Sequence, residues 1–224
     1  MVDGFFYLKV DLDPHPMFQL AEQVFDLPLD VKLAYKMDGK NGLDSQALPN
    51  LHRIRESSGD QLRLTKSTMY PISNESSIDV SLGAHTDFGS ITILFNRQYG
   101  LQVMKTDKEW LFVRPIPGHA IVNLGDAMVK LSGRRLKSNI HRVVTAPRLS
   151  EVTDRYSVAY FARPENNVRM KSLVDGDHQS LSVDDDVLTA EKWIERRVKH
   201  FQTENYLNEE TYAMSRGTEH YREA

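Results

Sequence analysis

The sequence contains no cysteine, which excludes disulfide bonds and any metal site built from thiolates. It also lacks a basic excess, because 28 Lys and Arg are balanced by 31 Asp and Glu, for a net charge of -3. That balance argues against nucleic acid or a membrane surface as a partner. No apolar run reaches the roughly 18 residues of a membrane span, and Met1–Gly4 lacks the basic start of a signal peptide. We therefore expect a cytoplasmic protein.

What the sequence does contain is a long β-rich region within 224 residues, enough for a domain with a sizeable core. Turn residues separate short apolar segments from residue 80 to residue 164, and this spacing is typical of a jelly-roll sandwich or barrel. The strands expected there are 90–95, 100–104, 109–113, 118–124, 141–144 and 156–162. The predicted fold class is mainly β with flanking helices.

The flanking segments have weaker patterns. Residues 4–10 and 61–69 are typical of strands, whereas apolar residues recur at helical spacing in 16–25, and a shorter helical stretch follows at 31–35. Residues 36–60 are polar and predict loops. A C-terminal helix is expected over 189–201.

The most informative motif is His85-Thr86-Asp87, with His141 further along the chain. In extended structure alternate side chains share a face, so His85 and Asp87 would point inward together while Thr86 points away. Two imidazoles and one carboxylate form the facial triad that holds non-haem Fe(II) and leaves coordination positions open. Alone, the His-x-Asp pattern can arise by chance, and His141 can be an ordinary core histidine.

A second pair, Arg155 and Ser157, has the same two-residue spacing on an apolar strand. A guanidinium can bind a carboxylate in bidentate fashion, and the hydroxyl adds a further donor. A buried arginine needs an anionic partner, which is either an internal Asp or Glu or the carboxylate of a ligand.

Taken together, the motifs resemble the iron(II)- and 2-oxoglutarate-dependent dioxygenases of the isopenicillin-N-synthase-like superfamily. The resemblance covers about residues 61–165 and is carried by segments in the family's order and spacing: Leu82–Leu94, Gly100–Val103, Pro115–Gly118, Val122–Asp126, Ser138–Val143 and Arg155–Phe161. It implies a double-stranded β-helix (jelly-roll) core.

The resemblance also implies roles for single residues. His85, Asp87 and His141 would bind Fe(II), and Arg155, Ser157 and Tyr70 would hold the distal carboxylate of 2-oxoglutarate. Asn123, Gly125 and Asp126 look like a structural turn motif. Either Phe88 or Phe161, or both, would face the substrate or belong to the core.

The implied activity is oxidation of a C–H bond in a small organic molecule by O2, as hydroxylation, desaturation or cyclisation, with release of succinate and CO2. A specialised metabolite or a nucleobase-sized molecule would suit the family. The alternatives are an oxidase that works without 2-oxoglutarate, as isopenicillin N synthase does, and a non-catalytic paralogue.

The resemblance divides the chain into a partial N-terminal α/β region (1–60), the β-helix core (61–165) and a C-terminal helical segment (166–224). Family members are longer and have a long helix before the sandwich, for which residues 36–60 leave little room. The chain could be a truncated isoform, a degenerate paralogue, or a sequence with segments missing. We favour the last, because the catalytic core is intact and a chain without a core helix should fold poorly.

Overall fold

The computed structural model describes residues 5–10, 48–53, 55–71, 80–105, 109–145, 151–174 and 188–201. The helices expected over 16–25 and 31–35 lie outside these residues. In chain order, the elements are β1 (Phe5–Lys9), the 3-10 helix η2 (Pro49–Leu51), β2 (Gln61–Met69), β3 (Val80–His85), β4 (Ile91–Asn96), β5 (Leu101–Met104), β6 (Trp110–Phe112), β7 (His119–Leu124), α3 (Asp126–Leu131), β8 (His141–Val144), β9 (Thr153–Ala162) and α4 (Ala190–Phe201).

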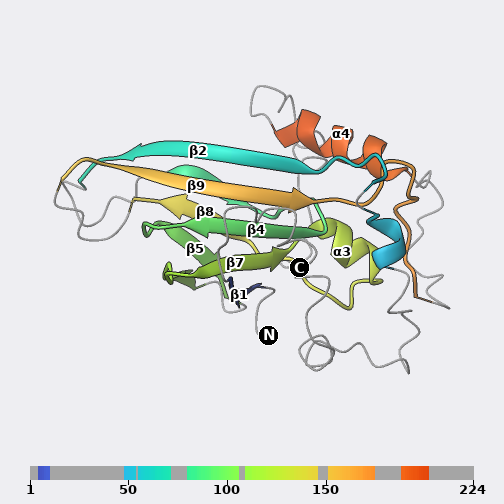
Figure 1. The fold of residues 1–224 in the computed structure, drawn as a ribbon, viewed down its shortest axis with the longest axis horizontal. Helices are drawn as coiled ribbons and strands as arrows, with labels where there is room; N and C mark the ends of the chain where they lie inside the picture. The colour runs from blue at the N-terminus through green and yellow to red at the C-terminus, as the bar shows by residue number, and fades with distance from the viewer. Residues whose placement is uncertain are drawn as a thin grey trace.

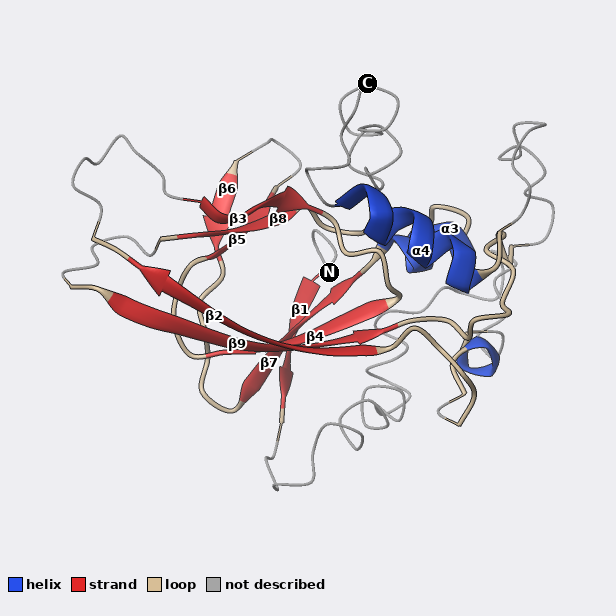
Figure 2. Cartoon of the chain, turned by 90° about the horizontal axis from the view of Figure 1, so that it is seen from above, coloured by secondary structure: helices blue, strands red, loops and turns tan. Residues whose placement is uncertain are grey.

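The strands form two antiparallel sheets that face each other as a jelly roll (Figures 1 and 2). The larger sheet has the order β1-β7-β4-β9-β2, and the smaller one has the order β3-β8-β5-β6. Neighbours in each sheet are mostly distant in sequence, so the connections cross between the layers. This brings β3 beside β8 and places both opposite β9, which is the arrangement that assembles the site.

The strict two-residue alternation of the larger sheet gives it two different faces. Its outward side chains form one apolar cluster, which includes Ile93 and Val122. Its inward side chains meet those of the smaller sheet in a second cluster, made of Met69, Leu101, Val103, Val113, Ile121 and Val143. This second cluster lies between the two sheets.

Both α-helices lie at the same end of the sandwich (Figures 1 and 2). They pack together through a third apolar cluster, in which Ala127 and Leu131 of α3 contact Met170 and Ala190, and Trp193 of α4 packs against it. No helix in the described ranges is long and apolar enough to cross a bilayer.

The predicted strands are present, with β9 beginning at Thr153 rather than at residue 156, and α4 confirms the expected C-terminal helix. Three elements go beyond the predictions. The 3-10 helix η2 lies within residues 36–60, where loops are expected. The sequence predicts no separate strand at β3, although the whole region is predicted to be β-rich. Where α3 forms, the sequence indicates a turn. With six residues, α3 is too short for a clear helical period.

Candidate metal centre and its pocket

Two histidines from different strands meet at the edge of the smaller sheet. β3 pairs with β8 so that His85 stands directly opposite His141. Their ring centroids are 4.3 Å apart and the ring planes are inclined by 55°. Two residues that are far apart in the sequence are therefore brought together by a single cross-strand pair.

Asp87 completes the group from the loop that follows β3. Its Oδ1 lies 3.8 Å from Nε2 of His85 and 3.8 Å from Nε2 of His141. One ligand atom from each of the three residues lies within 4.8 Å of the other two. Among the described residues, this is the cluster of His, Asp and Glu side chains that could hold a metal ion. The prediction that these residues converge is confirmed, although the strand ends at His85, so Asp87 is not on it.

The outer nitrogens of both imidazoles are held by backbone carbonyls. Nδ1 of His85 lies 2.8 Å from the carbonyl oxygen of Gly83, and Nδ1 of His141 lies 3.1 Å from that of Asn139. A carbonyl can only accept, so each Nδ1 carries a hydrogen, and in the neutral imidazole each Nε2 then presents a lone pair. Both lone pairs therefore lie on the side where Oδ1 of Asp87 is found.

Two side chains fix the carboxylate of Asp87 in the same way. Thr92 Oγ1 and Asn123 Nδ2 donate to Oδ2 at 2.7 and 2.8 Å, which leaves Oδ1 toward the histidines. Burial alone would raise the pKa of Asp87, but His141, His85 and these two hydrogen bonds hold it below its usual value. The group is therefore an ionised carboxylate beside two imidazoles, a donor set that suits a divalent cation such as Fe(II).

The Asp87 loop leaves the sheet because it is bonded to the start of α3. The carbonyl of Asp87 accepts from the backbone N–H of Asp126 at 2.7 Å, and that of Gly89 accepts from Ala127 at 3.1 Å. A Cβ at Gly125 would lie 2.2 Å from the Gly89 oxygen, so a side chain there would push the loop away. Helix α3 thus replaces a neighbouring strand as the partner of this loop.

The side chain of Asp126 connects three parts of the site. Its buried carboxylate accepts from Thr86 Oγ1 at 2.8 Å, from Ser138 Oγ at 2.7 Å and from Arg197 Nη2 at 3.0 Å. Thr86 lies between two of the candidate ligands, Ser138 shortly precedes the third, and Arg197 belongs to α4. As expected, Thr86 points away from the two candidate ligands, and its buried hydroxyl has a specific partner.

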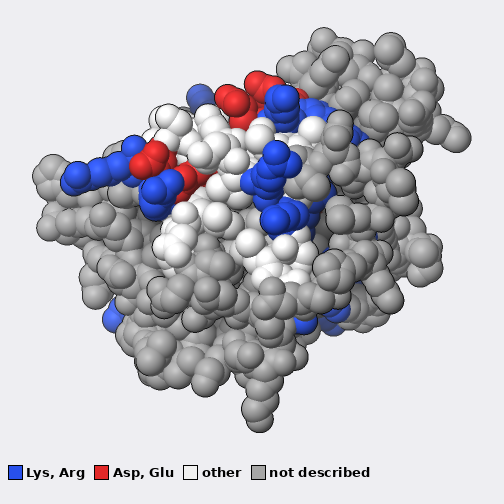
Figure 3. Space-filling model, turned by 90° about the vertical axis from the view of Figure 1, so that its right-hand side faces the viewer, with Lys and Arg blue, Asp and Glu red and all other residues white. Residues whose placement is uncertain are grey.

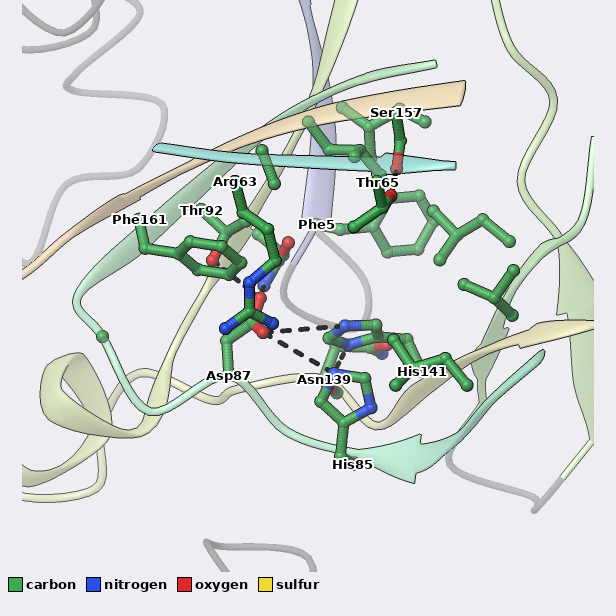
Figure 4. A pocket seen from close by; sticks show the side chains of 18 of the residues that line it. Phe5, Arg63, Thr65, His85, Asp87, Thr92, Asn139, His141, Ser157 and Phe161 are labelled. Atoms are coloured by element: carbon green, nitrogen blue, oxygen red, sulfur yellow. Dashed lines mark hydrogen bonds and ion pairs between the residues drawn. The ribbon is translucent and has the colours of Figure 1, made fainter. Parts of the chain in front are cut away.

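A pocket of about 380 Å³ opens beside the three ligands and extends between the two sheets. Figure 4 shows His85, Asp87 and His141 at one side, with Ser157 and Thr65 on the strands across from them. Its lining includes inward residues of β2 and β9, in particular Arg63, Thr65, Ser67, Arg155, Ser157, Ala159 and Phe161.

Arg155 and Ser157 both line this pocket, as the sequence predicted. Arg155 is only 3% exposed, and its Nε donates to the carbonyl of Tyr99 at 3.2 Å. Its Nη2 is buried without a hydrogen-bond partner among the described residues. Burial lowers the pKa of Arg155, but an arginine side chain keeps its proton in proteins. A buried positive charge with a donor to spare is a site for an anion.

The remaining predicted residues differ in where they lie. Phe88 and Phe161 both line the pocket, beneath the guanidinium groups of Arg163 and Arg63 respectively. Tyr70 is 58% exposed and is not among the lining residues. It follows Met69, whose side chain fills the inner cluster, so Tyr70 faces the other way. The cosubstrate contact of Tyr70 stays a prediction.

Several functional residues were missed by sequence reasoning. The patterns place Thr92 only within a strand and Asn123 within a turn, yet both position Asp87. Arg63 and Thr65 were not singled out either. Both lie an even number of residues before Ser67, so they share its face of β2. The pairing of β2 with β9 places that face beside Arg155 and Ser157.

Comparison with known proteins agrees with this geometry. Residues 56–164 match the model of the 2OG-Fe(II) oxygenase superfamily. This region, just under half of the chain, is similar in sequence to that superfamily. All of the predicted metal ligands and both members of the Arg155–Ser157 pair lie within it.

Curated relatives point the same way. The chain is 44% identical over 112 residues to the 2-oxoglutarate-dependent dioxygenase iboH of Amanita muscaria, which corresponds to 49% of this chain and 50% of the relative. It is 39% identical over 133 residues to the 2-oxoglutarate-dependent dioxygenase frbH of a Dothideomycetidae species, or 58% of this chain and 40% of the relative. The chain thus spans about half the length, or less, of these relatives.

Among solved structures, the fold is similar to that of a full-length Neurospora crassa protein in complex with alpha-KG and 5-formyluracil. The TM-score is 0.61 at 24% sequence identity, over 87% of this chain and 68% of that chain. At this identity the similarity concerns the fold, and it confirms the predicted jelly-roll class.

The hydrogen bond from Asn123 to Asp87 generates a first prediction. Asn123→Ala should weaken the binding of a divalent metal by about 10- to 100-fold, because partners that orient a metal ligand typically contribute that much. A calorimetric titration with Co(II) measures the change in affinity. Asn50→Ala, at an exposed asparagine of η2, is the matched control and should leave the affinity unchanged. Equal affinities in the two variants would contradict the role of Asn123.

The buried Asp126–Arg197 pair generates a second prediction. Asp126→Ala should lower the free energy of unfolding by about 3–5 kcal/mol, because it leaves Arg197 charged and buried without its carboxylate. Urea denaturation measures this. Glu109→Ala breaks an exposed pair with Lys105 and should cost only about 0–1 kcal/mol. Similar losses in the two variants would contradict the role of Asp126.

Proposed function

We propose that this chain is the catalytic part of an Fe(II)- and 2-oxoglutarate-dependent oxygenase that oxidises a C–H bond of a small organic molecule. The observation that carries the proposal is the pairing, in one pocket, of the three convergent ligands with the spare buried donor of Arg155. Neither feature alone would select this chemistry, since each also occurs in proteins of other function.

The three ligands suit Fe(II) because two neutral imidazoles and one carboxylate leave the remaining coordination positions to ligands that come and go. His85, Asp87 and His141 would hold the ion. Thr92 and Asn123 would keep Oδ1 of Asp87 directed at it, and the carbonyls of Gly83 and Asn139 would keep both Nε2 atoms available.

The pair Arg155 and Ser157 suits the distal carboxylate of 2-oxoglutarate. The free Nη2 of Arg155 would donate to it, and the Ser157 hydroxyl, which now pairs with Thr65 at 2.5 Å, would add a second donor. Thr65 stands opposite Ser157 in the register of β2 and β9. We therefore add Thr65 to the proposed clamp as the group that orients the serine hydroxyl.

Iron bound at this site would supply the activation of O2, in which 2-oxoglutarate is oxidised to succinate and CO2 and the second oxygen atom becomes available to oxidise the substrate. The protein's residues bind and orient the reactants around it. The inner apolar cluster behind the pocket, with Leu101, Val103 and Val143 in its lining, would exclude water from that side.

The curated relatives carry the name 2-oxoglutarate-dependent dioxygenase, which supports the reaction class. A small-molecule substrate is supported by the pocket's size. We also propose a cytoplasmic location, which the absence of cysteine supports, and no nucleic-acid partner. On the face in Figure 3, basic side chains occur in separate groups, some of which lie beside acidic ones.

The experiment that tests the proposal is an anaerobic titration of the Fe(II)-loaded protein with 2-oxoglutarate, followed by visible absorption. A weak charge-transfer band should appear, because a 2-oxo acid that chelates an open iron site through its oxo and carboxylate oxygens produces one. His85→Ala should abolish it. Iron binding without the band would favour an oxidase that needs no 2-oxoglutarate, and failure to bind iron would favour a non-catalytic paralogue.

A further prediction separates the clamp from the metal. Arg155→Ala should weaken 2-oxoglutarate binding by about 10- to 100-fold, which corresponds to roughly 1.5–3 kcal/mol for a hydrogen bond to a charged group, with metal affinity unchanged. The 2-oxoglutarate titration measures the first quantity, and the Co(II) titration measures the metal affinity. Arg135→Ala, at an exposed arginine, removes the same charge outside the pocket and should have no effect. An unchanged dependence on 2-oxoglutarate in Arg155→Ala would exclude Arg155 from the clamp.

A further inference from the structure

Besides Arg155, the pocket contains two more arginines, at its other end. Arg63 and Arg163 both line it, and neither has a role in holding the metal or the proposed cosubstrate. Arg63 stands opposite Ala159 in the register of β2 and β9, whereas Arg155 stands opposite Ser67. Four residues of extended chain, about 13 Å, separate Arg63 from Ser67. The guanidinium groups therefore serve different ends of the same pocket.

Figure 4 shows how the Arg63 side chain lies. It extends from β2 past the ring of Phe161 toward Asp87, on the opposite side of the pocket from Ser157 and Thr65. Its guanidinium carbon is 5.3 Å from the centroid of the Phe161 ring, a contact that orients the group without neutralising it. Arg63 is exposed, so it lies where the pocket is accessible from solvent.

The hydrogen bonds of the two arginines differ. Arg163 is buried, and both of its terminal nitrogens are used, by the carbonyl of Gly59 and by Oε1 of Gln61. Arg63 makes a single long contact of 3.5 Å, to the same Gln61 oxygen, and no ion pair of Arg63 occurs among the described residues. A guanidinium has five N–H donors. Arg63 therefore keeps most of its donors for a ligand, while Arg163 adds positive charge behind it.

The charge of the pocket indicates which ligand. Among the residues that the structure describes, its charged lining residues are Arg63, Arg155, Arg163 and Asp87, so three positive charges against one negative charge leave an excess of two. Fe(II) and the 2-oxoglutarate dianion would cancel each other. The two excess positive charges of the pocket would then remain. Because unbalanced charge is costly in a partly closed site, they favour a negatively charged substrate. Burial lowers the pKa of Arg163, the nearby carboxylate of Asp60 acts against this, and the neighbouring charge of Arg63 lowers the pKa further.

We propose that the substrate is an organic acid whose carboxylate binds the guanidinium of Arg63, with Phe161 holding that guanidinium in place. This inference rests on the proposed function, since it assigns the other end of the pocket to 2-oxoglutarate. It makes Arg63 a specificity-determining residue. A bidentate arginine–carboxylate pair would fix one end of the substrate and so determine which C–H bond lies next to the metal.

The test compares acids with their uncharged amides of the same shape. Protein loaded anaerobically with Fe(II) and saturating 2-oxoglutarate is titrated by calorimetry with phenylacetate and phenylacetamide, and with hexanoate and hexanamide. The wild-type protein should bind the acids at least tenfold more tightly than the amides. Arg63→Gln should reduce that preference by about tenfold or more, and Arg63→Lys should keep part of it.

Lys66→Gln is the matched control. It removes the same charge from the same strand, but Lys66 lies on the outer face, paired with Asp154, so the preference should stay as in the wild type. The visible absorption band of the 2-oxoglutarate complex is recorded in every sample. Its presence shows that the variant is folded and that the acid has not displaced the cosubstrate from Arg155.

The outcomes separate the two proposals. A missing band in the wild type would contradict the proposed function. A normal band with no preference for either acid, or with a preference that Arg63→Gln leaves unchanged, would overturn the assignment of Arg63 while the proposed function stands. A preference lost equally in Arg63→Gln and Lys66→Gln would reduce the effect to general electrostatic attraction and would also overturn it.

Discussion

The candidate metal centre depends on one buried carboxylate, that of Asp126. Its two oxygens accept from Thr86, Ser138 and Arg197, and its own N–H donates to the carbonyl of Asp87. A carboxylate without partners would be very costly at 3% exposure, so the fold must supply these contacts. Because Thr86 is flanked by two ligands and Ser138 precedes the third, satisfying Asp126 also sets the positions of all three. The same requirement attaches α4 to the site through Arg197.

The pocket above this centre follows from strand alternation. Inward positions of β2 at Arg63, Thr65 and Ser67, and of β9 at Arg155 and Ser157, carry polar or charged side chains, whereas Val103 of β5 and Val143 of β8 are apolar. Over this short stretch, hydrogen-bond donors on one sheet therefore face an apolar surface on the other. A charged arginine as buried as Arg155 normally pairs with an internal carboxylate. In this pocket an anion that binds from solution would take the place of that carboxylate.

Much of this could be predicted from the sequence, and the reasons differ from residue to residue. The strands were predictable because alternation and turn residues are local signals, and Arg155 and Ser157 because they share one strand. That Asn123 and Thr92 serve Asp87 could not be predicted, because it depends on the pairing of β4 with β7, a contact between segments distant in sequence. The loop course of Asp87 was missed for a similar reason. It depends on bonds to α3, and six residues give a helix too little periodicity to be recognised.

The two ends of the pocket also impose different demands on their arginines. Arg155 is buried and keeps one nitrogen without a partner among the described residues. This unpaired donor lowers the stability of the empty protein, and a bound carboxylate would remove that cost. Arg63 is exposed and hydrated, and it loses little when the pocket is empty. The curated relatives share the name 2-oxoglutarate-dependent dioxygenase, and a cosubstrate common to them would suit a fixed, desolvated clamp. A substrate that differs between them would suit a residue at the rim, because replacing Arg63 would leave the buried network around Asp126 undisturbed.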